Sequence, residues 1–294
     1  MVIVNTRPHA ARLFDLAKSR SVTAIHISAS MCPAHRSEVV KRIRAKLKAH
    51  EPCLVISTQV VEAGVDLDFP VVYRAMAGLD SIIQAAGRCN REGLGLTGKV
   101  YVFATTETPP PEIKTAANNT AQVLASVDSI TPDPLDLDTI ERYFNLHYWT
   151  QGGPAPQWDG PLGTDGHREK GGITSLLSGL EPSFRTAAHL YRLIPDATHA
   201  VVVPFDDEAR ALIVQARQTQ ALDGRSLKAL WRRSQSYSVS LRQREYETLL
   251  DKGLVEVTDS GMSVVSSFGN VQGTYSVEVG LRPDIVSALT PTII

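Results

Sequence analysis

The chain has 294 residues and a mass of 32.0 kDa, with 43% hydrophobic and 21% charged residues. This is ordinary globular usage, which excludes a disordered or fibrous protein, and the length suggests about two domains. The sequence has no run of the ~18 consecutive apolar residues that a membrane-spanning helix needs, and its first residues do not resemble a signal peptide. Three cysteines, odd in number and far apart, predict neither disulfides nor a zinc site, so we expect reduced thiols and a cytoplasmic protein.

A formal net charge of −1 hides an asymmetry along the chain. Residues 1–106 hold 14 Lys and Arg against 8 Asp and Glu, a net charge of +6, whereas the remainder has a net charge of −7. Such a basic segment can attract a polyanion through counterion release, with Lys41, Arg42 and Arg44 on one predicted helix as candidates. Solvated basic residues on helix faces would give the same count, so both interpretations stay open.

Short apolar runs alternate with helical patterns in the first third of the chain. Apolar residues at helical spacing predict helices near residues 10–17, 34–50 and 81–88. The strand-like runs cover residues 2–4, 23–27, 54–56, 71–73 and 100–103. This alternation predicts an α/β fold, and runs that are apolar throughout favour a mainly parallel sheet buried between helices.

A Pro-rich stretch at residues 107–111 predicts a stiff linker between a domain over 1–106 and a C-terminal domain over 112–294. The second domain is predicted to be mostly helical and to contain a long Gly- and Pro-rich surface loop. The predicted helices are near 112–127, 139–149, 183–193, 208–220 and 227–234, a strand is predicted at 200–203, and the loop covers 151–172. Apolar runs at 255–257, 262–265 and 275–279 predict a small antiparallel appendage.

The clearest chemical signal is the segment 84–91, which reads Gln-Ala-Ala-Gly-Arg-Cys-Asn-Arg. Arg88 and Arg91 would place two guanidinium groups near a common point, and such groups suit the oxygens of a transferring phosphoryl group. Gly87 inside a helix costs ~1 kcal/mol relative to alanine, which favours a close backbone approach there. The alternative is a helix end whose arginines bond the last carbonyl groups.

A second signal is the segment 57–66, which reads Ser-Thr-Gln-Val-Val-Glu-Ala-Gly-Val-Asp and follows an apolar strand. Polar side chains at the carboxyl end of a strand lie where open α/β sheets bind ligands. Thr58 and Gln59 can bond phosphate or sugar oxygens without reading a base sequence. Gly64 permits a turn, and Asp66 can orient a water, a ribose hydroxyl or an arginine. An ordinary capped turn is the alternative.

These two segments resemble motifs V and VI of superfamily 2 helicases, and Val4-Asn5-Thr6-Arg7 resembles motif IV. Residues 57–70 and 79–93 are more narrowly similar to the helicase-nuclease of type I CRISPR-Cas systems, and residues 26–36 resemble its subtype C branch. The similarity is specific over residues 1–103 and diffuse beyond them. It implies that residues 1–106 are the second RecA-like lobe of such an enzyme.

The resemblance also implies roles for single residues. Arg88 and Arg91 would act as arginine fingers on ATP bound by a partner lobe, and Gln84 would order the nucleotide. Gly64, Asp66 and Gly87 would complete the nucleotide contacts. The backbone of single-stranded DNA would be contacted by Asn5, Thr6, Arg7, Ser57, Thr58 and Gln59. The arginine-finger role requires Arg88 and Arg91 to face an open cleft, and not the interior or local ion pairs.

The chain is expected to lack the family's nuclease domain and first RecA-like lobe, so ATP and Mg²⁺ would be held mainly by that lobe. There is no His-Asp dipeptide of a metal-dependent nuclease, and we expect no metal site. Residues 93–99 match the first seven positions of a phosphate-binding loop. Val100 replaces the hydroxyl that would hold magnesium, and the segment leads into a predicted strand, which favours a simple turn.

Residues 201–209 imitate a strand that ends in an acidic magnesium site. Pro204 inside this run predicts a strand at the edge of its sheet. Asp207 and Glu208 are expected to be the first acids of a helix, where the helix dipole favours negative charge.

The resemblance therefore predicts the C-terminal portion of an ATP-dependent single-stranded DNA helicase or translocase of type I CRISPR-Cas interference, an antiviral defence. Its expected partners are single-stranded DNA, the nuclease and first lobe, and the RNA-guided surveillance complex, with no membrane. The isolated chain is predicted to be inactive. One alternative is a non-catalytic module that binds single-stranded DNA or docks to the surveillance complex, and another is a helicase fragment outside CRISPR immunity.

Overall fold

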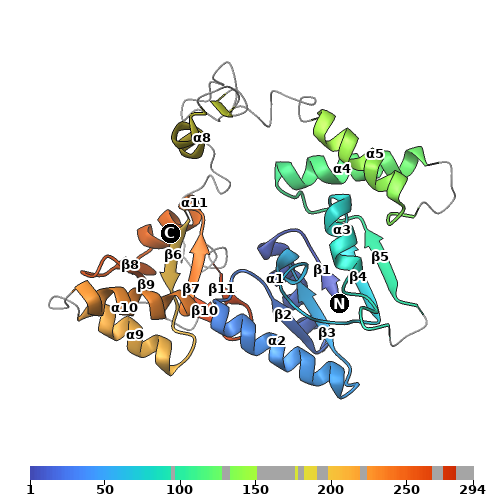
Figure 1. The fold of residues 1–294 in the computed structure, drawn as a ribbon. Helices are drawn as coiled ribbons and strands as arrows, with labels where there is room; N and C mark the ends of the chain where they lie inside the picture. Colours follow the sequence, from blue (N-terminus) through green and yellow to red (C-terminus); the bar gives the residue numbers. More distant parts are fainter. Residues whose placement is uncertain are drawn as a thin grey trace, which may run out of the picture. The chain divides into compact units, whose positions relative to one another are not determined.

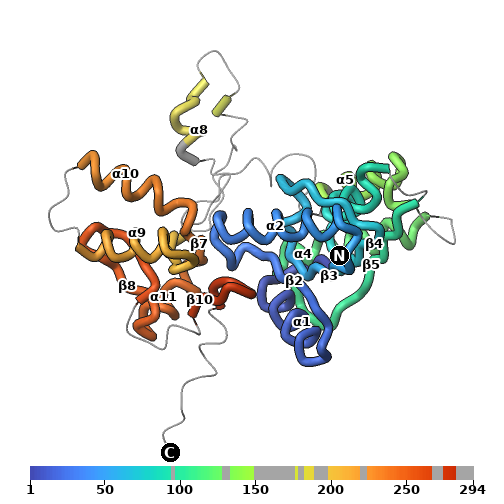
Figure 2. The backbone as a smooth tube through the Cα atoms, turned by 90° about the horizontal axis from the view of Figure 1, so that it is seen from below, coloured from blue at the N-terminus to red at the C-terminus, as the bar shows by residue number. Residues whose placement is uncertain are grey.

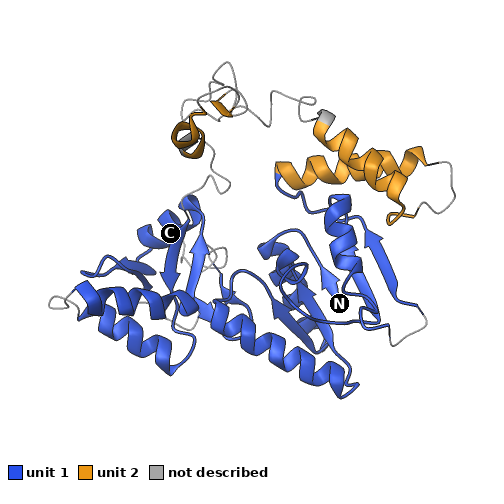
Figure 3. Cartoon of the chain, viewed as in Figure 1, with its two compact units in different colours: residues 1–110, 197–294 blue, residues 111–196 orange. Residues whose placement is uncertain are grey.

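The computed structural model describes residues 1–93, 97–127, 133–150, 176–177, 182–190, 198–218, 224–266 and 274–282. The chain divides into two compact units, one of residues 1–110 with 197–294 and one of residues 111–196 (Figure 3). The predicted loop at 151–172 lies outside the described residues. This division into compact units does not test the predicted domains, which cover residues 1–106 and 112–294. They therefore stay a prediction.

A five-stranded sheet forms the centre of the N-terminal part of the first unit (Figure 1). Its spatial order is β2-β3-β1-β4-β5, and every neighbouring pair runs parallel, which confirms the predicted sheet. The strands are β1 (Val2–Ile3), β2 (Ala24–Ile27), β3 (Leu54–Ser57), β4 (Val71–Ala75) and β5 (Lys99–Phe103). The helices between them are α1 (Arg7–Ser19), α2 (Pro33–Lys48) and α3 (Leu79–Ala86), with a short 3-10 turn η1 (Gln59–Val61) after β3.

Successive strand residues point to opposite sides of a sheet, and both sides are packed around β1, β2 and β3, whereas Tyr73 of β4 and Tyr101 of β5 are exposed. On one face Ile25 and Val55 pack in a cluster with Ile43 of α2. On the other face Ile56 packs in a cluster with Phe14 of α1. Burial on two sides explains why β1, β2 and β3 read as continuous apolar runs and not as an alternating pattern.

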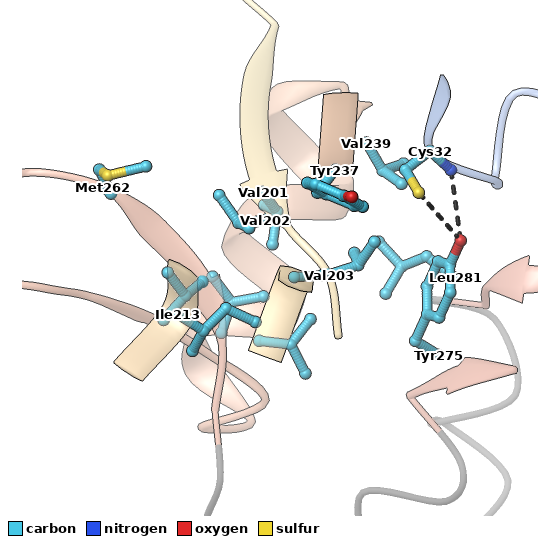
Figure 4. Packing of buried hydrophobic residues seen from close by; sticks show 14 of the residues in the cluster. Cys32, Val201, Val202, Val203, Ile213, Tyr237, Val239, Met262, Tyr275 and Leu281 are labelled. Carbon is cyan, nitrogen blue, oxygen red and sulfur yellow. Dashed lines mark hydrogen bonds between the residues drawn. The ribbon is translucent and has the colours of Figure 1, made fainter. Parts of the chain in front are cut away.

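A four-stranded mixed sheet organises the C-terminal part of the same unit. Its order is β7-β6-β9-β8, with β6 and β9 parallel and the other pairs antiparallel. The strands are β6 (His199–Val202), β7 (Ser238–Leu241), β8 (Val255–Val257) and β9 (Ser263–Val265). The helices around it are α9 (Asp207–Arg217), α10 (Gly224–Ser234) and α11 (Gln243–Asp251), and the turn η2 (Gln235–Tyr237) precedes β7. Figure 4 shows its core, where Val201, Val239 and Ile213 converge.

The strand β6 lies between β7 and β9, so the predicted edge position is wrong. The strand ends at Val202, before Pro204, and the missing amide hydrogen of that proline therefore removes no bond from the ladder. Asp207 and Glu208 do lie in the first turn of α9, as predicted, and Asp206 caps that helix. The segment 201–209 is thus a strand, a turn and a capped helix.

A small hairpin links the two parts of the first unit. It consists of β10 (Tyr275–Ser276) and β11 (Gly280–Leu281), which pair antiparallel. The Tyr275 hydroxyl accepts a hydrogen bond from the Cys32 backbone nitrogen at 3.3 Å (Figure 4) and lies 2.8 Å from His35 Nδ1. Because Cys32 and Ala34 also belong to the core of the second sheet, the start of α2 packs against that sheet (Figure 2).

Gly280 makes the closest backbone contact of this hairpin. Its φ of +78° is in the left-handed region, and a Cβ at this position would lie 2.3 Å from the Ser30 carbonyl oxygen. That carbonyl accepts a hydrogen bond from the Leu281 backbone nitrogen at 2.8 Å. The hairpin can therefore approach the loop between β2 and α2 only with glycine at this position.

The second unit contains a pair of helices at the predicted places, α4 (Pro111–Ser126) and α5 (Leu137–Thr150). Tyr143 of α5 is buried, and its ring stacks on His147. A further helix, α8 (Phe184–Leu190), covers part of the prediction at 183–193, and the rest of that prediction lies outside the described residues. Among the described helices of the whole chain, none is long and apolar enough to span a membrane.

Candidate nucleotide and nucleic-acid site

Three segments that the sequence singled out contact one another beside the parallel sheet, and two of them, after β1 and β3, lie at its carboxyl end. The residues after β1 and β3 are joined where Gln59 Nε2 donates to the Asn5 carbonyl at 3.2 Å. The segment after α3 contacts the second of these through Arg88, whose Nη2 donates to the Glu62 carbonyl, while paired backbone bonds with Phe69 hold residues 88–90 near the start of β4. Tertiary structure therefore brings segments 4–7 and 57–62 together at the edge where open α/β sheets bind ligands, with segment 84–91 beside them.

Arg88 faces the interior at this junction. The residue is only 8% exposed, and its Nη2 donates to the Glu62 carbonyl at 2.7 Å. Burial lowers the pKa of Arg88, and the positive charge of Arg91 lowers it further. In this structure Arg88 thus holds segment 59–62 against the end of α3 and does not present its guanidinium to an open cleft.

Arg91 lies at the surface beside the same segment. Its side chain is 47% exposed, and its Nε lies 3.1 Å from Asp66 Oδ1. The Arg91 backbone nitrogen donates to Asp68 Oδ1 at 2.8 Å, which fixes the start of the side chain. An exposed ion pair of this kind contributes only about 0.2–1 kcal/mol, so Arg91 can exchange Asp66 for a phosphate at small cost.

The other residues predicted to bind ATP are exposed. Gln84 and Gly87 lie at the end of α3, and Gly64 has a φ of +71° at a place where a Cβ would meet no other atom within 4 Å. Gly87 follows the last residue of α3, so the cost of a glycine inside a helix does not apply to it, and that argument from the sequence is wrong. The predicted nucleotide contacts of these residues stay predictions.

A buried polar network lies beneath the junction and was missed by the sequence argument. Arg74 of β4 is fully buried, and its Nε lies 2.8 Å from Glu62 Oε1. Arg74 Nη1 donates to Asn5 Oδ1 at 2.7 Å, and Nη2 donates to Ser81 Oγ at 2.9 Å. Ser81 in turn donates to Glu62 Oε2 at 2.7 Å. A lone arginine inside an apolar strand was the one signal in the sequence that pointed to it.

This network holds an ion pair in the interior. Burial raises the pKa of the Glu62 carboxyl, and the Arg74 guanidinium beside it opposes that shift. Because Asn5, Glu62 and Ser81 come from three different segments, their bonds to Arg74 fix these segments relative to one another. Arg74 and Glu62 therefore position the backbone to which Arg88 bonds.

Half of the residues predicted to contact DNA are buried. Asn5 belongs to the Arg74 network, Ser57 Oγ donates to the Thr58 carbonyl, and Thr58 is itself buried. The partly exposed ones are Thr6, Arg7 and Gln59. Thr6 also caps α1, because its Oγ1 accepts a hydrogen bond from a backbone N–H of the first turn. The predicted strand contacts stay predictions, and exposure favours the last three residues.

A basic groove of about 570 Å³ opens beside Arg7, between α1 and α11. Both oxygens of Glu245 lie 2.8 Å from Arg7 Nη2, and Arg282 Nη1 lies 2.8 Å from Asp15 Oδ2. The residues that line it are Arg7, Pro8, Ala11, His26, Ser30, Arg242, Arg244, Glu245, Thr248, Val279, Leu281 and Arg282. Four arginines against one lining glutamate make this groove suitable for an anionic chain.

The sequence argument missed the C-terminal contribution to this groove. Arg242 and Arg244 flank Gln243 at the start of α11, and both are exposed. In the sequence, only the short basic run at residues 242–244 could have indicated them. The residues next to that run in the chain do not predict that it lies beside Arg7. Arg44 of the basic helix α2 donates to the Asp66 carbonyl at 2.9 Å, so this candidate for phosphate contact also supports the junction.

The chain is similar to known proteins in sequence and in fold. A family model described as the C-terminal region of the CRISPR-associated nuclease/helicase Cas3 matches residues 1–94. A CRISPR-associated nuclease/helicase Cas3 from Haloferax volcanii is 65% identical over 40 residues, which are 14% of this chain and 4% of that protein.

Two crystal structures of T. fusca Cas3 share the fold. One is similar with a TM-score of 0.52 at 14% identity, and another, with AMPPNP, has a TM-score of 0.50 at 15% identity. Each comparison covers 96% of this chain and 38% of the T. fusca chain. The chain thus spans less than half the length of the relatives it resembles.

Proposed function

We propose that the chain, whose residues 1–94 match the model of the Cas3 C-terminal region, supplies the second RecA-like lobe of an ATP-dependent single-stranded DNA translocase in type I CRISPR-Cas interference. Its partners would be a first lobe that holds ATP and Mg²⁺, a single DNA strand, and the RNA-guided surveillance complex. The observation that carries the proposal is the junction of segments 59–66 and 84–91, where Arg91 is exposed beside Asp66.

The chemistry of the proposal rests on Arg91. Phosphoryl transfer spreads negative charge over the equatorial oxygens, and an arginine that reaches them contributes about 10³–10⁵ in rate. Arg91 can leave Asp66 for those oxygens at small cost. Arg88 would first have to give up its bond to the Glu62 carbonyl, and hydrogen bonds of charged groups contribute roughly 1.5–3 kcal/mol. We therefore assign the main finger role to Arg91 and a positioning role to Arg88.

The nucleotide itself would come from the first lobe. The solved T. fusca Cas3 structure with AMPPNP, of similar fold, supports nucleotide binding by such enzymes. In this chain, Lys99 of the apparent phosphate-binding loop begins the strand β5, as predicted, and Val100 stands at the magnesium-binding position. We accordingly expect the chain by itself to hydrolyse no ATP.

The DNA strand would lie over Thr6, Arg7 and Gln59 and follow the basic groove toward α11. Arg7 is held by Glu245 through an ion pair that is partly exposed, so a phosphate can compete for it. Arg242 and Arg244 add charge along the same path. Contacts of this kind bind the backbone and do not read sequence.

Reconstitution tests the proposal. This chain is mixed with a separately produced first lobe that carries a complete phosphate-binding loop, and hydrolysis of ATP is measured with and without single-stranded DNA. We expect activity only in the mixture, a loss of about 10³-fold or more in Arg91→Ala, and a smaller loss in Arg88→Ala. Arg20→Ala, an exposed arginine just after α1 and outside the junction, is the matched control and should keep full activity.

One observation favours a second candidate, a module that binds DNA or docks to the surveillance complex without motor action. Arg88 faces the interior and Arg91 is paired with Asp66, so neither guanidinium is free in this structure. That candidate predicts strand binding by the chain and no ATP hydrolysis in the mixture. Full hydrolysis in Arg91→Ala would contradict the arginine-finger assignment.

A further inference from the structure

A second pocket lies on the other side of the loop between β2 and α2. Its volume is about 440 Å³. The lining residues are Ala29, Pro33, Arg36, Ala200, Val202, Trp231, Ser234, Gln235, Ser238, Ser240, Met262 and Ser263. They come from α2, from one side of the mixed sheet and from the end of α10. Four serine hydroxyls, one amide, one guanidinium and one indole line it, and no carboxylate is among the lining residues.

The indole of Trp231 is 43% exposed at the mouth of this pocket. Trp231, Ser234 and Gln235 are spaced by three and four residues on α10 and its continuation, so they share one face of the helix. Lys228 lies one turn earlier on that face and is exposed. An exposed aromatic ring beside a solvated lysine is the combination on which a base stacks while its phosphate is neutralised.

Ser234 lines the pocket, and its hydroxyl is buried without a hydrogen-bond partner among the described residues. Ser234 is 2% exposed, and its Oγ makes no hydrogen bond within the structure. Its carbonyl accepts a bond from Ser238 Oγ at 2.7 Å, so that neighbouring hydroxyl is already committed. A buried polar atom without a partner is costly, and a ligand with hydrogen-bonding edges would satisfy it once the Ser234 side chain turns toward the pocket.

The pocket adjoins the basic groove. Ala29 lines the pocket and Ser30, the next residue, lines the groove. Ser240 of β7 lines the pocket, and Arg242, two residues later, lines the groove. Consecutive Cα atoms are about 3.8 Å apart, so the two cavities share residues 29–30 and 240–242 as a common wall. A strand whose phosphates lie in the groove would pass around this wall to place a base in the pocket.

We propose that this pocket, with Trp231 and the hydroxyls of Ser234 and Ser240, is a subsite that receives one base of the single-stranded nucleic acid whose backbone lies in the basic groove. The inference rests on the proposed function and extends it to the C-terminal part of the unit. The base stacks on the indole, and its polar edge faces the hydroxyls. Every nucleobase has a stacking face and polar edges, so the subsite holds a strand without reading its sequence.

The test compares two labelled oligonucleotides with the same number of phosphates, one of thymidines and one with abasic sugars in their place. Binding to the full chain is followed by fluorescence anisotropy at several salt concentrations. We expect the thymidine strand to bind roughly 5- to 150-fold more tightly, the factor that stacking of one base contributes. Trp231→Ala should remove this preference, and Trp231→Phe should keep part of it.

Tyr101→Ala is the matched control, because Tyr101 of β5 is similarly exposed and stacks on Tyr73 away from the pocket. It should leave the preference unchanged, and thermal melting shows whether each variant folds. If Trp231→Ala binds both strands with the wild-type ratio, the base subsite is refuted and the proposed groove stands. If the wild-type chain binds neither strand, the proposed DNA function is refuted and the subsite with it.

Discussion

Replacement of Arg74 by methionine tests whether the buried network holds the candidate site together. The change removes a fully buried guanidinium and leaves Glu62 without its counter-charge. Asn5 Oδ1 and Ser81 Oγ lose bonds of 2.7 and 2.9 Å at the same time. Removing one partner of a buried ion pair costs about 3–5 kcal/mol, because the remaining charge stays desolvated.

The expected loss is large enough to be measured by calorimetry. In a unit of roughly 200 residues, 1 kcal/mol lowers the melting temperature by about 2–4 °C, so Arg74→Met should lower it by roughly 6–20 °C. Arg210→Met is the matched control, since Arg210 forms an exposed ion pair with Asp207 and should cost less than about 1 kcal/mol.

The double variant Arg74→Met with Glu62→Met separates the missing charge from the missing volume. With both charges removed, we expect much of the lost stability to return, because the unpaired carboxylate no longer has to be buried. Equal melting temperatures for Arg74→Met and Arg210→Met would refute the role assigned to the network. A double variant less stable than Arg74→Met would show that desolvated charge is not the cause.

Two further predictions concern stability. Burial lowers the pKa of His26 from 6.5 to about 4, with Arg282 adding to the shift and Asp15 opposing it. The unfolded chain binds the proton more readily, so about 3 kcal/mol of stability present above pH 6.5 should be lost as the pH falls toward 4. Urea unfolding of wild type and His26→Asn across this range checks it, and a difference that does not change with pH would argue against it. Gly280→Ala should lower the melting temperature more than Gly261→Ala, since both have positive φ but only the first places a Cβ against the Ser30 carbonyl. Equal shifts would mean that backbone strain alone determines the cost.

The order of elements in the parallel sheet could be predicted because periodicity is a local property. The runs at 54–56 and 100–103 and the stripe over 34–50 indicated β3, β5 and α2 to within a few residues. The sequence argument missed β7 and α11, whose residues are rich in serine and charged side chains. Those elements form because Val239 and Leu249 complete a core that is assembled from distant segments.

The candidate site could be predicted only in part. The segments around Gln59 and Gln84 were found, because their residue types are unusual next to apolar strands. The exposure of their side chains could not be predicted from the sequence. Arg88 and Arg91 are the same residue type three positions apart, and they differ only in how far other segments of the fold bury them. The groove beside Arg7 depends on Glu245, which is 238 positions away in the chain.

The amino-acid sequence by itself was enough to predict the strands and helices in the N-terminal part of the first unit. It also showed which segments carry residue types that suit phosphate chemistry. Hydrophobic periodicity and charge are properties of residues that are neighbours in the chain. They do not depend on how the helices and strands are arranged in space. Only the tertiary structure decided that Arg74 neutralises Glu62 and that Arg91 and not Arg88 is exposed. It also decided that the start of α11 lies beside α1. Desolvation and ion pairing depend on atoms a few ångströms away in space, and these atoms come from segments that are far apart in the chain.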